Sequence, residues 1–504
     1  MQPVLLIGFV IIACVSPLLT FTTLWQVKEW RIDRLREHLR SEGIFRQLFG
    51  LSRPAIVLAG FAGGYITLYA LDGALILLAG ASAAQILTRK QRFPVRTQKA
   101  ITLIGASIVI DIIISFQLSA FSFQILIPLL QPIVVLLSWI LFLPLDQFLK
   151  RRVMKKATSL RRRFINATVI GITGSVGKTT TKELIAHILN DQNMLCTPAY
   201  VNSEMGVAQW MLRELSEKDD QEEATLIVEM GAYCKGEIEK LCHIAAPSIG
   251  IITFIGSQHI ALFGSQEKLC RAKGELLECL PEDGRAFLNA DNSLCSAMEN
   301  LPACPVTKVG TGGVADLEAF DIEETGAGIT FRVGDQTIST ALHGTHNVTN
   351  VLLAISVARH LGLPLTEIAS RLRSFTPPHQ TFSVRAQNGV SILDDTHNAS
   401  PESFRAAIAW AKAQPAKQKI LLTPGLIELG TDEDRIHREL GVQAKGVFSR
   451  VVFTSKHGLN AFKEGYNEPM EQLSPKSEPL EQGDLVLCVG RIGSGTIERL
   501  LPHS

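Results

Sequence analysis

Residues 167–182 read ATVIGITGSVGKTTTK, and this stretch determines how the rest of the chain is interpreted. An apolar run predicts a buried strand, the glycines after it predict a tight turn, and Lys178 and Thr179 open a predicted helix. Glycines let backbone N–H groups approach phosphate oxygens, and the start of a helix carries a partial positive charge. A lysine here reaches the terminal phosphates, and a threonine hydroxyl here binds Mg²⁺. The stretch therefore predicts a nucleoside triphosphate site, although Ile172 stands where the strict motif has its first glycine.

The composition divides the chain into an apolar part and a more polar part. Only 19% of the 504 residues are charged, and most of the apolar excess lies before residue 150. The net charge of +1 gives no field that would attract nucleic acid, so we expect no nucleic-acid partner. The nine cysteines are scattered without a C-x-x-C pair, which is typical of a reducing compartment and argues against structural zinc or disulfides.

Apolar stretches dominate the part before the phosphate loop. There are five, at roughly 3–25, 54–70, 74–88, 100–117 and 122–144. A helix needs about 20 apolar residues to cross a bilayer, and the first and last stretches are long enough. The second and third are short, and Leu71-Asp72-Gly73 predicts a tight turn between them in a helical hairpin; one long broken helix is the alternative. We expect residues 1–150 to form a transmembrane region of about five helices that contacts the lipid bilayer.

Basic residues predict the orientation of these helices. They fill the segments 28–53, 89–99 and 150–163, which should all face the cytoplasm. Two hairpins separate these segments by an even number of crossings, so the expected location is the inner or plasma membrane, multi-pass, with the triphosphate site in the cytoplasm. The basic segment 150–163 could bind anionic lipid or only set the topology. Asp111, inside the fourth stretch, either has a direct role or faces the bundle and pairs with a neighbour.

From about residue 164 the pattern changes to alternating strands and helices. Strands are expected at 226–231, 249–255 and 285–289, and this alternation predicts a mainly parallel sheet covered on both faces. Residues 316–344 alternate polar and apolar around glycines, as antiparallel hairpins do, and a helix is expected at about 346–361. A second α/β unit follows Pro377-Pro378, with strands near 390–395, 419–424, 450–454 and 484–489. The expected domains are a membrane helical bundle at 1–150, a P-loop-type α/β domain at 164–378 and a smaller Rossmann-like α/β domain at 379–504.

Further motifs follow the phosphate loop in order. They are Asn202–Gly206, Glu229–Ala232, Gly236–Ile238, Gly256–His259, Phe263–Ser265, Arg271–Glu275, Leu288–Asp291, Gly344–Asn350, Asp394–Pro401 and Gly425–Gly430. The ordered set resembles the Mur ligases, the ATP-dependent amide-forming enzymes of cell-wall synthesis, and within them the D-alanyl-D-alanine-adding branch. The resemblance covers about residues 165–504.

This resemblance implies an activity and its reactants. The family activates a carboxylate as an acyl phosphate with ATP and Mg²⁺, forms ADP, and lets an amine attack. The expected reactants here are a nucleotide- or lipid-linked cell-wall precursor and an amino acid or dipeptide. Residues of the loop that should hold ATP are Thr173, Gly174, Ser175, Gly177, Lys178, Thr179 and Thr180.

The resemblance also assigns roles outside the loop. Glu229, directly after the strand residues Leu-Ile-Val, and His259 should help Thr179 to hold magnesium; the alternative for Glu229 is a helix-capping or exposed carboxylate. Lys273 corresponds to the lysine that the family carbamoylates, which would let it bind a second magnesium. The expected catalytic set is therefore Lys178, Glu229, His259 and Lys273.

Four more residues belong to the expected nucleotide site. Asn347 and Asn350 match the family's adenine-side asparagines, although Asn347 could simply cap a helix. Asp395 and His397 follow a predicted strand, and ligands of open α/β sheets bind at such strand ends.

Departures from the family pattern leave other readings open. A membrane region stands in place of the family's small domain for the uridine-diphosphate sugar. His379-Gln380 replaces Gly-Arg, and Val489–Ile492 stands where the family has Lys-Gly-Ser-Arg. The family's ATP binding and acyl activation therefore transfer well to this chain, whereas its recognition of the acceptor and amine transfers poorly. The alternatives are a membrane-anchored ligase of the poly-γ-glutamate type, a membrane transporter or sensor switched by nucleotide, and a degenerate ligase that serves as a scaffold.

Overall fold

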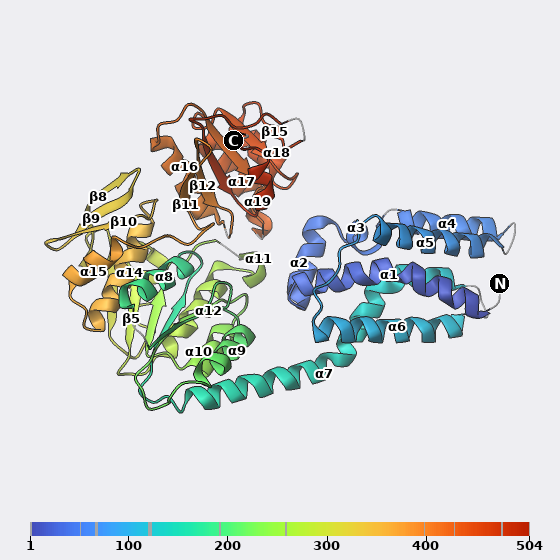
Figure 1. The fold of residues 1–504 in the computed structure, drawn as a ribbon, viewed down its shortest axis with the longest axis horizontal. Coiled ribbons are helices and arrows are strands. Elements are labelled where there is room, and N and C mark those ends of the chain that lie inside the picture. The colour runs from blue at the N-terminus through green and yellow to red at the C-terminus, as the bar shows by residue number, and fades with distance from the viewer. Residues whose placement is uncertain are drawn as a thin grey trace. The chain divides into compact units, whose positions relative to one another are not determined.

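The chain forms two compact units in the computed structural model, Met1–Arg151 and Arg152–Ser504 (Figure 1). The structure describes residues 3–50, 52–65, 69–118, 123–190, 193–257, 260–397, 399–427, 429–474 and 477–502.

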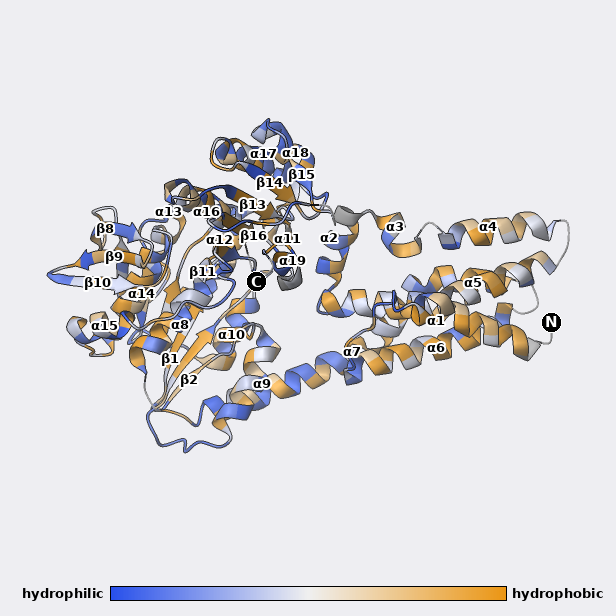
Figure 2. Ribbon diagram, turned by 45° about the horizontal axis from the view of Figure 1, so that its top comes forward, coloured by the Kyte–Doolittle hydropathy of each residue, from blue (hydrophilic) through white to orange (hydrophobic). Residues whose placement is uncertain are grey.

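The first unit is helical. Its helices are α1 (Pro3–Val27), α2 (Ile32–Glu42), α3 (Ile44–Phe49), α4 (Ser52–Gly64), α5 (Tyr69–Leu87), α6 (Gln98–Leu118) and the first part of α7 (Ile127–Arg161). Within the described residues, four helical segments are long and apolar enough to cross a membrane: Leu5–Val27, Tyr69–Leu87, Gln98–Leu118 and Phe123–Arg161. Hydrophobic residues line most of their length, whereas α2 is largely hydrophilic (Figure 2).

Two expectations for this unit, the second of about five spanning helices and the turn after it, need correction. Residues 54–64 of the second apolar stretch lie in α4, whose 13 residues extend about 20 Å, less than the hydrocarbon thickness of about 30 Å. The tight turn expected at Leu71-Asp72-Gly73 lies inside α5 instead. A single glycine costs a helix only about 1 kcal/mol, so the apolar residues on both sides continue the helix through Gly73.

Polar side chains are buried between the apolar helices. Asp111 is 1% exposed, and its Oδ1 accepts a hydrogen bond of 2.8 Å from Gln131 Nε2 on α7. Ser107 and Ser138 join the same two helices through their hydroxyls at 2.9 Å. Asp111 therefore pairs with a neighbour inside the bundle, as one of the two readings of the sequence expected.

The second unit contains a seven-stranded, wholly parallel sheet. Its order is β2-β3-β1-β4-β5-β6-β7. The strands are β1 (Thr168–Thr173), β2 (Met194–Cys196), β3 (Thr225–Glu229), β4 (Ile249–Ile252), β5 (Arg285–Asn289), β6 (Val306–Gly310) and β7 (Leu317–Glu318). The helices of this part are α8 (Lys178–Leu189), α9 (Glu204–Leu215), α10 (Glu237–Ala245), α11 (Ile260–Phe263), α12 (Gln266–Glu278), α13 (Ser293–Ser296), α14 (Asn347–His360) and α15 (Leu365–Leu372).

Both faces of this sheet are covered, as the sequence predicts. Side chains alternate along β1, so that Val169 joins a core cluster with α9, α10 and α12, and Ile170 joins a second cluster with α8 and α14. Buried faces on both sides explain the continuous apolar runs of these strands. The expected hairpins form a separate antiparallel sheet of β8 (Phe320–Thr325), β9 (Gly328–Val333) and β10 (Gln336–Thr340).

A six-stranded sheet forms the C-terminal part, in the order β11-β12-β16-β13-β14-β15. Its strands are β11 (Ser383–Gln387), β12 (Val390–Asp395), β13 (Lys419–Thr423), β14 (Arg450–Phe453), β15 (Glu471–Gln472) and β16 (Leu485–Val489); β11 is antiparallel to β12 and the other pairs are parallel. Helices α16 (Pro401–Ala413), α17 (Glu433–Ala444), α18 (Leu459–Tyr466) and α19 (Ser494–Glu498) accompany them. The strands expected after Pro377-Pro378 are thus confirmed within a residue of their predicted bounds.

The end of α7 belongs to this second unit. Ala157 is fully buried in the cluster of α9, α10 and α12, and Arg161 donates hydrogen bonds to the carbonyl oxygens of Ala245, Phe164 and Ala167. The remaining basic residues of 151–163 are exposed.

Candidate active site

The turn between β1 and α8 is a phosphate loop whose glycines are required by its shape. Gly174 has φ of +149° and Gly177 has φ of +87°, both in the region that favours glycine. A Cβ at Gly174 would lie 2.1 Å from Thr253 Oγ1, and one at Gly177 would lie 2.4 Å from Asn350 Oδ1. Other parts of the chain therefore press against the loop, and no side chain fits at either position.

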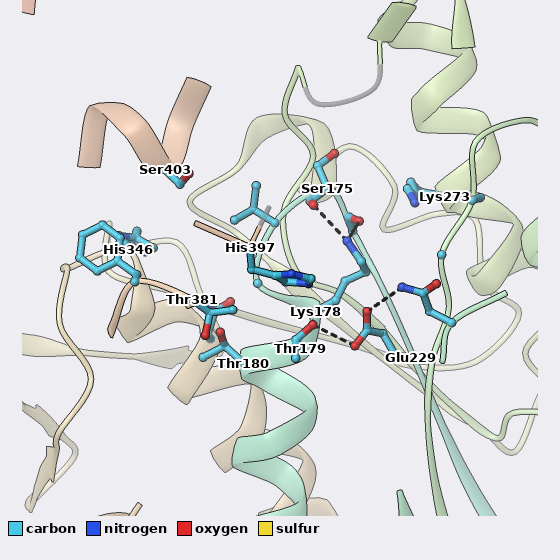
Figure 3. Close-up of a pocket in the computed structure, with 18 of the residues that line it drawn as sticks. Ser175, Lys178, Thr179, Thr180, Glu229, Lys273, His346, Thr381, His397 and Ser403 are labelled. Carbon is cyan, nitrogen blue, oxygen red and sulfur yellow. Dashed lines mark hydrogen bonds between the residues drawn. The ribbon is translucent and has the colours of Figure 1, made fainter. Parts of the chain in front are cut away.

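Lys178 is the first residue of α8 and folds back over this loop. Its Nζ donates to the carbonyl oxygens of Gly174 at 2.8 Å and Ser175 at 3.0 Å (Figure 3). Burial lowers the pKa of Lys178, and the negative charge of Glu229 opposes that shift. The ammonium group is thus held against the loop that the sequence predicts to bind phosphates.

Glu229 ends β3, the neighbour of β1 in the sheet, and pairs in register with Ile172. Its side chain accepts hydrogen bonds of 3.0 Å from Thr179 Oγ1 and from Asn202 Nδ2. Glu229 is only 4% exposed and its carboxylate meets the start of α8 (Figure 3). The alternative of a capping or exposed carboxylate is therefore wrong.

Lys182 is a buried cation of this site that the sequence analysis missed. It is 0% exposed, its Nζ donates to Thr197 O at 2.7 Å, and it lies 3.8 Å from Glu229 Oε2. The available signal was its spacing, because a residue four positions after Lys178 lies on the same face of α8.

Lys273 points into the same region from α12 and is 4% exposed. Burial, together with the Lys178 charge, lowers its pKa to about 7, while Glu237, Glu229 and Glu275 oppose the shift. Glu275 accepts hydrogen bonds from the backbone N–H groups of Gly236 at 2.6 Å and Glu239 at 3.1 Å, which ties the start of α10 to the helix that carries Lys273.

The oxygen atoms at this point fit magnesium. Mg²⁺ is usually held by one or two carboxylates together with water and substrate phosphates, and the Thr179 and Glu229 oxygens, 3.0 Å apart, supply such a set beside the phosphate loop. Among the described residues no group of three or more His, Cys, Asp and Glu side chains forms a complete metal cage. His259, the other expected ligand, lies outside the described residues.

Two asparagines of α14, Asn347 and Asn350, lie beside the turn between β1 and α8. Asn350 Nδ2 donates to Asn347 Oδ1 at 2.8 Å, and Asn347 Nδ2 donates to His343 O at 2.7 Å. Asn347 is the first residue of α14, its Oδ1 accepts from the Asn350 side chain and not from a backbone N–H, and His346 precedes it without a side-chain capping bond. The capping alternative for Asn347 is therefore wrong. His346 also lines the cavity, and burial lowers its pKa to about 4.

The C-terminal part contributes the residues after β12. Burial raises the pKa of Asp395 to about 6, against a hydrogen bond from Ser403. Burial also lowers the pKa of His397; Glu229 opposes this, and the Arg491 and Lys178 charges add to it. Arg491, which stands where the family pattern has a serine, thus contributes charge to the surroundings of His397, which the sequence did not predict. Asn398 lies outside the described residues.

These side chains line one open cavity. Of the expected residues the cavity is lined by Gly174, Ser175, Gly177, Lys178, Thr179, Thr180, Glu229, Lys273, Asn347, Asn350, Asp395 and His397. Thr173 is not among them, because its hydroxyl is fully buried and donates to Met230 O at 2.8 Å. The lining also includes residues to which sequence reasoning assigned no role, namely Val176, Asn202, Gly231, Ala232, Tyr233, Phe263, Leu269, His346, Thr381, Phe382 and Ser403.

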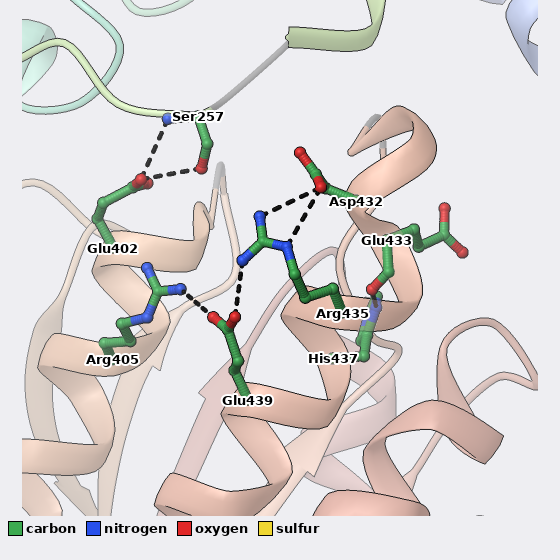
Figure 4. A network of polar contacts seen from close by, with 8 residues as sticks. All are labelled: Ser257, Glu402, Arg405, Asp432, Glu433, Arg435, His437 and Glu439. Atoms are coloured by element: carbon green, nitrogen blue, oxygen red, sulfur yellow. Dashed lines mark hydrogen bonds and ion pairs between the residues drawn. The ribbon is translucent and has the colours of Figure 1, made fainter.

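A polar contact joins the two α/β parts beside this cavity. Glu402, in the first turn of α16, accepts hydrogen bonds from Ser257 N at 3.1 Å and Ser257 Oγ at 2.9 Å (Figure 4). Behind it, Arg405 and Arg435 both pair with Glu439, which connects α16 to α17. The loop after β4 is thus held against the start of α16.

Comparison with known proteins identifies relatives over most of the second unit. The Mur ligase middle domain matches residues 172–358. The UDP-N-acetylmuramoyl-tripeptide–D-alanyl-D-alanine ligase of Bacillus subtilis is 31% identical over 340 residues, which are 64% of this chain and 73% of that protein. The ligase of the same name from Synechocystis is 36% identical over 292 residues, and the one from Mycobacterium tuberculosis is 33% identical over 302 residues. The chain spans only 62% and 58%, respectively, of the length of these last two relatives.

Solved structures agree with this match. The MurF ligase of Thermotoga maritima in complex with ADP is 26% identical, with 70% of this chain and 82% of that chain covered and a TM-score of 0.60. MurF from Acinetobacter baumannii shares the fold with a TM-score of 0.61 at 24% identity, over 68% of this chain and 78% of that one. With the phosphate loop and its partners in place, these likenesses show that the chain belongs to the Mur ligase family.

Proposed function

We propose that this protein is an ATP-dependent, ADP-forming ligase that joins an amino acid or dipeptide to a carboxylate of a cell-wall precursor. The observation that carries this proposal is the convergence of Lys178, Thr179, Glu229 and Lys273 on one cavity, although they come from α8, β3 and α12. A phosphoryl transfer needs positioned cations and a metal-binding carboxylate around the terminal phosphate, and this set supplies them.

The proposed reaction has two steps. A carboxylate oxygen of the precursor attacks the γ-phosphorus of ATP, the bond to the β-phosphate oxygen breaks, and ADP leaves. The amine nitrogen then attacks the acyl carbon, phosphate leaves, and the nitrogen loses a proton. Lys178 neutralises charge on the transferred group, and the cavity between the two α/β parts holds the acyl phosphate close to the amine. Thr179 and Glu229 would hold magnesium, with His259 as the further ligand expected from the family pattern, and the ion would supply positive charge to the phosphates.

Lys273 is proposed to act after carbamoylation. About half of its amine is uncharged at pH 7 because of its lowered pKa, and only an uncharged amine adds to CO₂. The nitrogen lone pair forms a bond to the carbon of CO₂, one C=O π bond opens onto oxygen, and one proton leaves, which turns the neutral amine into a carbamate anion. The modification thereby places a negative charge in the cavity with Lys178 and would create oxygen ligands for a second magnesium.

The reactants are proposed from the names of the relatives, which are UDP-N-acetylmuramoyl-tripeptide–D-alanyl-D-alanine ligases. We propose a muramyl tripeptide as the carboxylate and D-alanyl-D-alanine as the amine. The C-terminal part, proposed to be Rossmann-like, departs from the family at His379-Gln380 and Val489–Ile492, which leaves room for a different acceptor.

The helical unit supports a membrane-bound form of this function. Four helical segments have the length and apolar composition of membrane spans, and the basic segments between them favour a cytoplasmic ligase unit. We propose that the chain is a multi-pass protein of the inner or plasma membrane, and that its acceptor is lipid-linked. A membrane-anchored ligase of the poly-γ-glutamate type would use the same ATP site with another acceptor.

Phosphate release by the full chain in detergent tests the proposal. The protein is given MgATP and D-alanyl-D-alanine with either the nucleotide-linked muramyl tripeptide or its lipid-linked form. A separate assay offers MgATP, poly-γ-glutamate and glutamate. Acceptor-dependent phosphate and a new amide product are expected, lost in Lys178→Ala and retained in Lys412→Ala, which removes an exposed lysine of α16. Nucleotide binding without any acceptor-dependent phosphate would instead favour the nucleotide-switch reading.

A further inference from the structure

Residues 197–202 form an arch whose two ends are both fastened to Glu229. At one end the backbone N–H of Glu229 donates to Thr197 Oγ1 at 3.0 Å. At the other end Asn202 Nδ2 donates to Glu229 Oε1 at 3.0 Å. Lys182 Nζ holds the first end a second time through Thr197 O at 2.7 Å. A displacement of the arch therefore acts directly on the carboxylate that faces Thr179.

Tyr200 stands at the top of this arch in a strained conformation. Its φ is +69°, a left-handed value that a bulky aromatic residue rarely adopts. The side chain is 69% exposed, so hydrophobic burial does not account for the strain. Its ring packs edge-on against the imidazole of His397, with ring centroids 4.6 Å apart and an interplanar angle of 75°.

The partner of this contact is also held on strained backbone. His397 N donates to Gln380 O at 3.1 Å, and Gln380 and Phe382 have φ of +63° and +49°. His397 follows β12 in the C-terminal part, whereas the arch belongs to the part built on β1. The contact of Tyr200 with His397 thus crosses between the two α/β parts at the cavity, and strained residues support it from both sides.

We propose that Tyr200 is a positioning residue that couples the placement of the C-terminal part to the geometry of Glu229. The inference rests on the proposed ligase function for its kinetic consequence. When His397 closes against Tyr200, the arch is pressed toward the cavity and its two ends fix both the backbone and the carboxylate of Glu229. When the C-terminal part moves away, the arch loses that support, and the carboxylate is no longer fixed for the phosphoryl transfer.

The variants that separate ring from backbone are Tyr200→Phe and Tyr200→Asn. Phenylalanine keeps the ring and loses only the hydroxyl, which the edge-on contact does not need. Asparagine tolerates a left-handed backbone and removes the ring, so the arch keeps its conformation and the protein still folds. Phe320→Ala is the matched control, because Phe320 is also an exposed aromatic residue of the second unit and lies on the β8 hairpin.

The kcat and the KM for MgATP are measured on the full chain in detergent. Hydrogen–deuterium exchange of residues 197–202 is measured on the same protein with and without a non-hydrolysable ATP analogue and Mg²⁺. For Tyr200→Asn we expect kcat to fall about 2- to 13-fold, the range of an aromatic pair contact, with a KM for MgATP within about twofold of the parent. The protection of the arch that the analogue produces should be lost in Tyr200→Asn and retained in Tyr200→Phe and Phe320→Ala.

Two results would overturn the proposal: unchanged kcat and arch protection in Tyr200→Asn, or an equal loss in Tyr200→Phe. The exchange measurement needs only nucleotide binding. If the parent protein shows no ligase turnover but its arch is protected in a ring-dependent manner, the proposed function fails while the coupling by Tyr200 stands.

Discussion

The lowered pKa of Lys273 predicts that this residue takes up CO₂ in a strongly pH-dependent manner. With a pKa of about 7, the amine is uncharged in about 91% of molecules at pH 8 and in about 9% at pH 6, whereas an ordinary lysine is uncharged in about 0.3% at pH 8. The reactive form at Lys273 therefore exceeds that of a surface lysine about 300-fold at pH 8, and it decreases about tenfold between pH 8 and pH 6.

The measurement is ¹³C NMR of the full chain in detergent with ¹³C-bicarbonate, between pH 6 and pH 8. We expect a protein carbamate signal that is present at pH 8, diminishes as the pH falls through 7, and is absent from Lys273→Gln. That variant also accounts for carbamates on other amines. The direction follows from burial and from the Lys178 charge, both of which favour the uncharged amine. No signal at pH 8 beyond that of Lys273→Gln would refute the reasoning.

Three further predictions concern the same site. Glu229→Gln removes the negative charge that faces Thr179, so we expect phosphate release to fall about 10- to 100-fold. Half-saturation should move to a higher Mg²⁺ concentration, and an unchanged Mg²⁺ titration would contradict the role of Glu229 as a magnesium ligand. Lys182→Met leaves Glu229 without the buried cation at 3.8 Å, so the free energy of unfolding should decrease by about 3–5 kcal/mol. Thermal or denaturant unfolding measures this against the control Lys412→Met, and equal stability of the two variants would show that the pair contributes nothing. Gly177→Ala and Gly236→Ala both place a side chain at positive φ, which costs about 1–3 kcal/mol. Only the Cβ at position 177 meets Asn350 Oδ1, at 2.4 Å, so only Gly177→Ala should weaken ATP binding in a calorimetric titration. Equal loss of binding in both variants would exclude contact with Asn350 as the cause.

Sequence reasoning was correct for features that depend on neighbouring residues and wrong for some that depend on residues distant in the sequence. The strand, turn and helix around Lys178 follow from residues within one short segment, and the structure reproduces them. The turn expected at Leu71-Asp72-Gly73 was wrong because helix continuity in an apolar segment depends on the neighbours that pack on it, and α5 runs through those residues. Thr173 was expected at the nucleotide because it belongs to the loop motif, yet its hydroxyl is occupied by Met230 O on the adjacent strand end.

The amino-acid sequence by itself determined the alternation of strands and helices, the phosphate loop and the family, because hydrophobic period, glycine placement and motif order are properties of the chain alone. Only the tertiary structure decided that Glu229 is shared by Thr179 and Asn202, that Lys182 is buried beside it, and that Tyr200 reaches His397. It also decided the pKa of Lys273, because burial and the nearby Lys178 charge act through space between segments almost a hundred residues apart. Charge, distance and exclusion of water are set by packing, and no periodicity along the chain records them.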